Sequence, residues 1–152
     1  MSFVPKYIIK RMVPPDALKN VDTDGKGKVD GFALKYVNVL APMKIEKNLD
    51  VEDLKKQLFD ADLEMDGKKL DVKKAAICAT GKKFTIENIA DIGGMELPVG
   101  GCLYIYYPLP GGLAAGKHVL HLKTKYKERV DETTLERDLS GTMTSKDLLA
   151  KS

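Results

Sequence analysis

Apolar and polar residues alternate with a period of two along most of this chain, which predicts strands with one buried and one wet face. In FDADLEMD, residues 59–66, apolar side chains share one side and acidic side chains share the other. The DGKK at 66–69 is typical of a hairpin turn. Further segments rich in β-branched and aromatic residues predict strands over 6–12, 31–40, 73–80, 101–107 and 117–127.

Helical patterns are few and short. Asp50 is placed to cap a helix over 51–58, and Thr85 is placed to cap one or two turns over 86–92, before two glycines. Short strands separated by turns favour a mainly all-β fold, an antiparallel β-sandwich or jelly-roll-like single domain with one or two short helices. We expect the sandwich to span residues 1–130.

The C-terminal tail, residues 131–152, is polar and has few apolar anchors. A segment of this composition frays unless something covers it. We therefore expect the tail to pack on a partner.

Composition and charge exclude several classes of protein. The 152 residues are enough for one domain, and the formal net charge of +3 comes from lysines interspersed with acids rather than from a basic face, which excludes a nucleic-acid reader. No run of 18 apolar residues is present and the first 18 residues lack the apolar core of a signal peptide, so we expect no membrane span and a cytoplasmic protein. Cys78 and Cys102 are interpreted as free thiols in a reducing compartment.

The stretch VDTDGKGKVDGF at 21–32 resembles the start of a calcium loop. Asp22, Asp24 and Gly27 match loop positions 1, 3 and 6, but Lys26 and Ala33 occupy positions 5 and 12, which need oxygen ligands. The stretch also lies between predicted strands rather than between helices. We interpret it as a turn.

The remaining polar residues predict no catalytic, cofactor-binding or metal-binding group in this chain. His118 and His121 project to opposite faces of a strand, His118 toward the core and His121 toward the wet face, so they share no metal. Alternate acidic residues along 60–66 lie about 6.5–7 Å apart, too far for one small ion, and a solvated face opposite lysines is favoured. No nucleophile elbow, zinc motif or phosphate loop occurs.

A tyrosine-rich stretch is the candidate contact with a partner or ligand. On a strand, Tyr104 and Tyr106 share one face and Tyr107 lies on the other. Tyrosine rings with polar tips suit a sugar-stacking platform or a protein interface, and they equally suit the core of the sandwich and its edge. The pattern leaves both interpretations open.

Five segments follow one another in a distinctive order along residues 6–127: KYIIKRMVPPDALKNV, GKVDGFALKYVN, FDADLEMDGKKLD, ATGKKFTIENIADI and PGGLAAGKHVLHLKTKYK. This ordered series resembles the small (β) subunit of the bacterial C-glycoside deglycosidases, and its most specific part is the last segment, residues 110–127. Two segments depart from the family pattern. Residues 41–57 replace a shorter loop that contains aromatic and arginine residues, and the chain after Val130 has no counterpart.

The resemblance implies an accessory subunit of a heteromeric carbon–carbon lyase. In this family the larger α subunit is a TIM barrel that holds a divalent metal, typically manganese, and the substrate is a 3-oxo-C-glucoside of a flavonoid or another aromatic. A ketone at C3 acidifies the C2 proton, so a base can remove it and elimination can expel the aromatic carbon. The alternative from the residues alone is a free-standing carbohydrate- or small-ligand-binding β-sandwich that uses Tyr104 and Tyr106.

Overall fold

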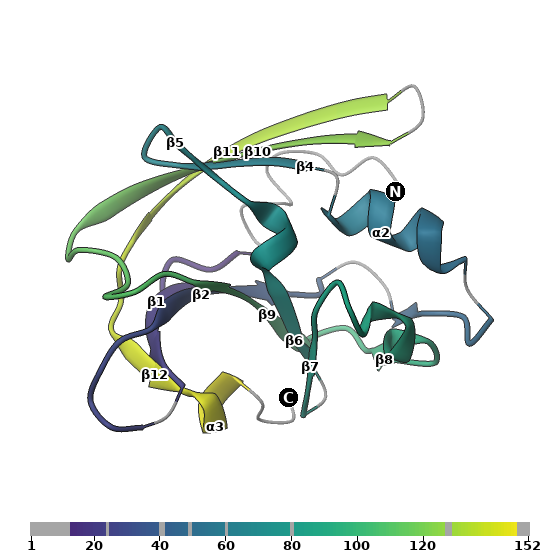
Figure 1. Ribbon diagram of the computed structural model, residues 1–152, viewed down its shortest axis with the longest axis horizontal. Helices are drawn as coiled ribbons and strands as arrows, with labels where there is room; N and C mark the ends of the chain where they lie inside the picture. Colours follow the sequence, from purple (N-terminus) through teal and green to yellow (C-terminus); the bar gives the residue numbers. More distant parts are fainter. Residues whose placement is uncertain are drawn as a thin grey trace.

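The computed structural model describes residues 13–23, 25–39, 42–48, 50–59, 61–79, 81–126 and 129–148. These residues form two main sheets that face each other, with short helices at the sides (Figure 1). The predicted all-β sandwich is confirmed. The strand predicted over 6–12 lies outside the described residues.

The larger sheet has six strands and is antiparallel except at one edge, where β12 runs parallel to β1. β2 and β9 form its centre and pair over seven residues each. In spatial order the strands are β12 (Thr142–Thr144), β1 (Leu18–Asp22), β2 (Gly31–Val37), β9 (Cys102–Pro108), β6 (Ala76–Ala79) and β7 (Lys82–Phe84).

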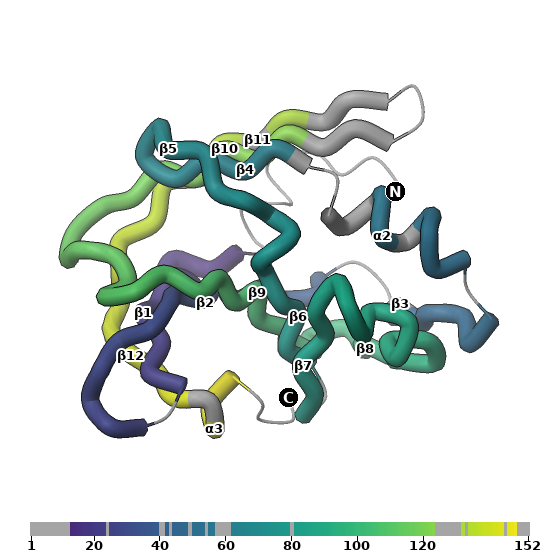
Figure 2. Tube along the Cα trace, in the orientation of Figure 1, coloured from purple at the N-terminus to yellow at the C-terminus, as the bar shows by residue number. Residues whose placement is uncertain are grey.

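The smaller sheet has four antiparallel strands, β11 (Arg129–Asp138), β10 (Lys117–Tyr126), β4 (Ala61–Met65) and β5 (Lys68–Leu70). A two-stranded sheet joins β3 (Met43–Lys44) to β8 (Glu96–Leu97), as the trace in Figure 2 shows. The helical elements are α2 (Val51–Phe59), η1 (Val72–Lys74), η2 (Ile89–Ile92) and α3 (Ser145–Leu148). None of the helices within the described ranges is long and apolar enough to cross a membrane.

Turn chemistry positions the predicted hairpins as expected. Asp66 and Gly67 both have positive φ, 54° and 81°, as the two-residue turn between β4 and β5 requires. The calcium-like stretch connects β1 to β2, and the Asp22 carboxylate accepts backbone N–H groups from Gly25 at 2.9 Å and Gly27 at 2.6 Å. The interpretation of this stretch as a turn is confirmed.

The predicted start of one helix is confirmed, whereas the predicted starts of a second helix and of one strand are wrong. The Asp50 carboxylate accepts the N–H of Asp53 at 3.2 Å, so the predicted cap of α2 is confirmed. Thr85 does not cap η2, because its N–H and hydroxyl bond to the side chain of Asn88, at 2.5 and 3.0 Å, and the helix begins only at Ile89. The strand predicted over 73–80 begins late, at Ala76, because the Asp71 side chain caps η1 over Val72–Lys74.

The core occupies both faces of the six-stranded sheet. Between the two sheets, Leu18, Phe32 and Tyr107 pack with Leu120 and Leu135 from the opposite layer. On the outer face of the six-stranded sheet, a second cluster forms from Val21, Ala33, Ala76, Cys78, Tyr106, Met143 and Leu148. A third cluster, Phe84, Ile89 and Ile92, lies at the end that η2 covers.

The prediction of a separate tail is wrong for the described residues up to 148. β11 pairs along the whole length of β10, and β12 pairs with β1, so the expected boundary at residue 130 falls inside the four-stranded sheet. Met143 and Leu148 are buried in the second core cluster. Composition missed this because strand pairing satisfies backbone groups and needs few apolar side chains.

Candidate functional site

The tyrosine-rich strand β9 places its rings in the core. Tyr104 and Tyr106 share one face and Tyr107 lies on the other, as the alternation predicts, but Tyr106 is 6% exposed and Tyr107 is 7% exposed. Only Tyr104 remains partly accessible. A stacking platform needs exposed ring faces, so the core-filling interpretation holds for Tyr106 and Tyr107.

Hydrogen bonds fix both buried tyrosines. The Tyr106 hydroxyl donates to the Asp30 carboxylate at 3.1 Å, and the Lys83 ammonium lies 5.0 Å from the ring centroid. Burial raises the pKa of Tyr106 to about 12, and the bond to Asp30 adds to the rise. Tyr107 packs against Phe32 and its hydroxyl accepts the N–H of Asp71 at 3.1 Å. Tyr106 is therefore a neutral structural donor at physiological pH.

The loop between β9 and β10, residues 109–116, carries the most specific part of the family resemblance. The Asn20 side chain, buried on β1, donates to the Leu113 carbonyl at 2.9 Å and accepts the Leu113 N–H at 2.7 Å. The Gly111 N–H donates to the Val29 carbonyl at 3.0 Å. The loop is thus attached to β1 and to the β1–β2 connection, and nothing in the local sequence around Asn20 indicates this role.

His118 connects the same loop to the four-stranded sheet. Its Nδ1 lies 2.6 Å from Oδ2 of Asp66, and its Nε2 lies 2.7 Å from the Ala114 carbonyl. Burial lowers the pKa of His118, but the bonds to Ala114 and Asp66 and the charge of Asp66 outweigh it, so the net pKa is raised. The pKa of Asp66 is lowered, mainly by the hydrogen bond from the Val119 backbone N–H and next by the hydrogen bond with His118. The predicted core-facing position of His118 is confirmed.

His121 lies on the other face of β10, as predicted, among paired charges. Its Nε2 is 2.6 Å from a Glu132 oxygen and its Nδ1 is 3.6 Å from a Glu64 oxygen. The acidic row faces a lysine at one position across the sheet, where Asp62 is opposite Lys123, while Glu64 is opposite His121. Asp60 lies outside the described residues. Exposed pairs of this kind contribute about 0–1 kcal/mol each, so this face is a solvated, charge-paired surface.

Both cysteines are free, as predicted. Cys78 is buried in the second core cluster, and this burial raises its pKa to about 11 although Lys83 acts in the opposite direction. Cys102 is partly exposed and its thiol points to the Gly100 carbonyl at 3.7 Å. The Cys78 thiol is therefore protonated and a poor nucleophile at neutral pH.

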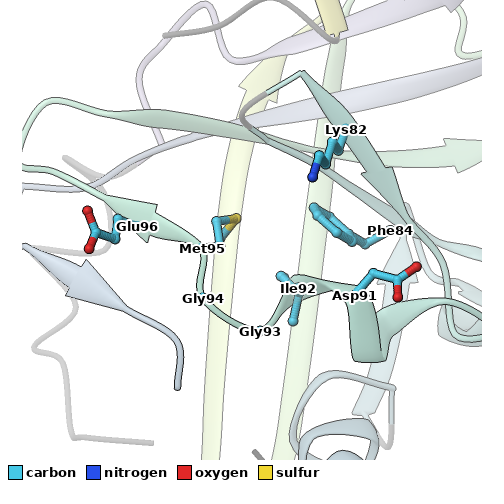
Figure 3. Close-up of a pocket in the computed structure, with 8 residues that line it drawn as sticks. All are labelled: Lys82, Phe84, Asp91, Ile92, Gly93, Gly94, Met95 and Glu96. Carbon is cyan, nitrogen blue, oxygen red and sulfur yellow. The ribbon is translucent and has the colours of Figure 1, made fainter. Parts of the chain in front are cut away.

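An open pocket of about 400 Å³ lies between β7, η2 and β8 (Figure 3). Phe84, Ile92 and Met95 form its floor, while the charged groups of Asp91 and Glu96 point away from it. Phe84 and Ile92 are almost completely buried in the third core cluster, so the floor presents little apolar surface to a ligand. No pattern in the sequence indicates this pocket, and its polar groups do not converge on a common point.

Within the described ranges, no cluster of three or more His, Cys, Asp or Glu side chains is arranged to hold a metal ion. Comparison of the chain with protein-family models and with curated proteins finds no match.

Proposed function

We propose that this chain is the accessory β subunit of a heteromeric C-glycoside deglycosidase. The support comes from the segment that carries the most specific part of the resemblance. Its described part, residues 110–126, uses polar groups to hold the fold together. The Asn20 side chain forms hydrogen bonds with the Leu113 backbone, and His118 forms hydrogen bonds with Ala114 and Asp66. A segment with this structural role fits a subunit whose fold, rather than its chemistry, is what the complex requires.

In the proposed complex the reaction takes place in a TIM-barrel α subunit. A divalent metal in that subunit, typically manganese, would supply Lewis acidity that helps a base to remove the C2 proton of a 3-oxo-C-glucoside. Elimination would then break the bond between C1 and the carbon of the flavonoid or other aromatic, leaving a double bond between C1 and C2 of the sugar while the aromatic carbon takes up a proton.

The described side chains of this chain fit a non-catalytic role. Both ring nitrogens of His118 are occupied, and His121 lies between two glutamates on the solvated face. The pKa values of Cys78 and Tyr106 are raised to about 11 and about 12, so neither supplies a thiolate or phenolate at neutral pH. A general base has to be poised near the working pH, which neither of these groups is.

An apolar corner at the end of β2 is the surface that we assign to the α subunit. Val99 is 55% exposed, the most exposed large hydrophobic residue in the described ranges, and Val39 is also exposed. Backbone bonds of Asn38 with Gly100, at 2.7 Å, and with Gly101, at 2.9 Å, hold the two valines on adjoining segments. Apolar residues in a rigid frame suit the core of an interface.

Co-expression with a candidate barrel subunit tests the proposal. We expect the two chains to elute together in size-exclusion chromatography and to cleave a 3-oxo-C-glucoside in the presence of manganese, an activity that neither chain shows alone. The interface should bury more than about 1,200 Å² in total. A barrel that is fully active without this chain, or a chain that elutes as a monomer beside the barrel, would contradict the proposal.

Paired variants test the docking corner. Val99→Asp places a charge in the proposed interface and should abolish co-elution. Lys28→Asp, an exposed change in the loop at the opposite end of β2, should leave it intact. If both variants bind equally well, the corner is not the docking surface.

The alternative, a free-standing carbohydrate- or small-ligand-binding module, has lost its main support. It required Tyr104 and Tyr106 to expose their rings together, and Tyr106 is buried. Sugar affinity in the isolated chain that disappears in Tyr104→Ala would restore it.

A further inference from the structure

Three segments that are distant in sequence meet at the imidazole of His118. The ring belongs to β10 and is 7% exposed, Asp66 belongs to the β4–β5 turn, and Ala114 belongs to the loop over residues 109–116. Asp66 is further fixed to β10, since its Oδ1 accepts the Val119 N–H at 2.8 Å and its own N–H donates to the Val119 carbonyl at 2.8 Å. The imidazole is thus the one described side chain that connects the loop to this turn.

The two partners of the ring determine its protonation state. A carbonyl oxygen only accepts hydrogen bonds, so Nε2 must carry a proton to bond Ala114. The Asp66 carboxylate has a lowered pKa and is ionised at neutral pH, so Nδ1 must also carry a proton to approach it at 2.6 Å. Both contacts together require the imidazolium form.

We propose that His118 is a proton-operated clasp: with both ring nitrogens protonated it ties the loop over residues 109–116 to the Asp66–Gly67 turn, and loss of one proton as pH rises releases the loop. A neutral imidazole has a single N–H and can satisfy only one of its two acceptors. Bonds to a charged acceptor are roughly twice as strong as neutral ones. The remaining proton therefore stays on Nδ1, facing Asp66, and the contact with Ala114 is the one that breaks.

Other charged groups near the clasp have partners of their own. Arg137 of β11 is the register partner of His118, and its guanidinium donates to the Val13 carbonyl at 2.6 Å and to the Pro14 carbonyl at 3.2 Å. Lys117, the neighbour of His118 on β10, pairs with Glu136 at 3.8 Å on the other face. Lys68 of β5 acts on Asp66 and favours its ionised form. Among these groups Asp66 is the anion that lies against the imidazole.

The direction of the pH effect follows from the raised pKa of His118. The contribution of the clasp is complete below the ordinary value of 6.5 and is lost as pH rises through the higher value of the folded state. On the acid side, the lowered pKa of Asp66 keeps the pair intact until pH falls through that value. The clasp is therefore closed between these two limits and opens above the upper one.

Solution NMR on the full chain tests the clasp. The chain has two histidines, so a His121→Asn variant leaves one imidazole signal and assigns His118. We expect ring nitrogen shifts of a doubly protonated imidazole at neutral pH and a midpoint above 6.5. Above that midpoint, amide-exchange protection of Leu113 and Leu139, whose N–H groups bond Asn20 and Gly116, should fall by up to about tenfold per pH unit. Protection of Lys35 in β2, whose N–H donates to the Ala17 carbonyl, should not change.

Two further variants distinguish release of the loop by His118 from a general loss of structure at high pH. Asp66→Asn keeps an acceptor for Val119 but removes the charge, so the His118 midpoint and the onset of loop exchange should both move to lower pH. His118→Gln should remove the pH dependence of loop protection, and His121→Asn should retain it. If His118→Gln does not fold, the titration of the wild type and the comparison with Asp66→Asn still test the proposal. A neutral His118 ring at pH 7, or loop protection that ignores pH while His118 titrates, would overturn the proposal.

Discussion

Each buried polar side chain in the described part of the chain holds a loop. Asn20 bonds Leu113, Asn38 bonds the Leu97 carbonyl at 3.0 Å, Asp22 accepts two N–H groups of its own turn, and His118 bonds Ala114. None of the buried side-chain polar atoms in these ranges lacks a partner. Loops cannot use strand ladders to satisfy their backbone groups, so polar side chains at strand ends do so instead. At the scale of single residues, loop conformation in this protein is determined by these side chains.

Two adjacent glycines in the loop over residues 109–116 allow the contribution of the Asn20 side chain to be measured. Both have positive φ, 80° at Gly111 and 65° at Gly112, but a Cβ on Gly111 would meet open space whereas one on Gly112 would clash with Asn20 and Val29. Gly111→Ala should lower the free energy of unfolding by about 1–2 kcal/mol, through backbone strain alone. Gly112→Ala should cost about 1–3 kcal/mol more, because Asn20 must give up its bonds with Leu113.

Urea unfolding of the two variants checks this prediction. Equal losses of stability would mean that the bonds between Asn20 and Leu113 contribute little.

At the scale of elements, the last strand closes the six-stranded sheet. β12 is three residues long and runs parallel to β1, with Asn20 opposite Thr142 and Asp22 opposite Thr144. The Asn20 N–H also donates to the Gly141 carbonyl at 2.9 Å, which fixes the entry into β12. A strand this short depends on its one buried side chain, Met143, for packing energy.

Truncation of that side chain should destabilise the isolated chain. Met143→Ala removes a side chain that packs on Val21, Ala33 and Tyr106, and should cost about 2–5 kcal/mol. Thr142→Ala, an exposed change one residue earlier, should stay within about 0.5 kcal/mol. Thermal unfolding of both variants without any partner provides the measurement. A negligible effect of Met143→Ala on the free chain, with a large effect in a complex, would instead favour a tail that is held by a partner.

At the scale of the whole molecule, one sheet carries core on both faces while the other has a wet face. The six-stranded sheet packs the four-stranded sheet on one side and the cluster around Tyr106 and Met143 on the other. The outer face of the four-stranded sheet carries charge pairs such as Lys69 with Asp62, at 3.5 Å. Apolar burial is therefore concentrated around β1, β2 and β9. Two groups whose shifted pKa values couple stability to pH, Asp66 and His118, lie at the smaller sheet, whereas Cys78 and Tyr106 lie on the larger one.

The acid limb of the stability curve should report Asp66. Its lowered pKa means that its contribution is present above the ordinary value of 3.8 and is lost as pH falls through the lower folded value. Asp66→Asn should be less stable than the wild type near pH 6, and the difference should shrink as pH falls below about 3.8. Denaturant midpoints from pH 2 to pH 7 measure it.

Asp62→Asn on the same sheet is the matched control. It breaks an exposed pair with Lys69, so its stability should follow the wild type throughout. A constant gap between Asp66→Asn and the wild type at all pH values would show that the carboxylate acts through packing and not through charge.

The sequence by itself determined the local elements of this protein. Alternation identified β2, β4, β6, β9 and β10, the Asp66–Gly67 pair identified the hairpin that leads into β5, and Asp50 identified the start of α2. Alternation did not identify β1, β7 or the last two strands, β11 and β12. These features depend on side-chain period, positive φ and capping, which act over a few residues. The opposite orientations of His118 and His121 followed from the same period.

Only the tertiary structure decided which strands become neighbours and which faces are covered. β12 pairs with β1 across about 120 residues of chain, and Tyr106 is buried in the same cluster as Met143 and Leu148. The same holds for the clasp, since His118, Asp66 and Ala114 meet only after β4, β10 and their loop have come together. A period-two pattern specifies that a face is apolar, but the partner that covers it is chosen by long-range packing and by backbone pairing, which no local pattern encodes.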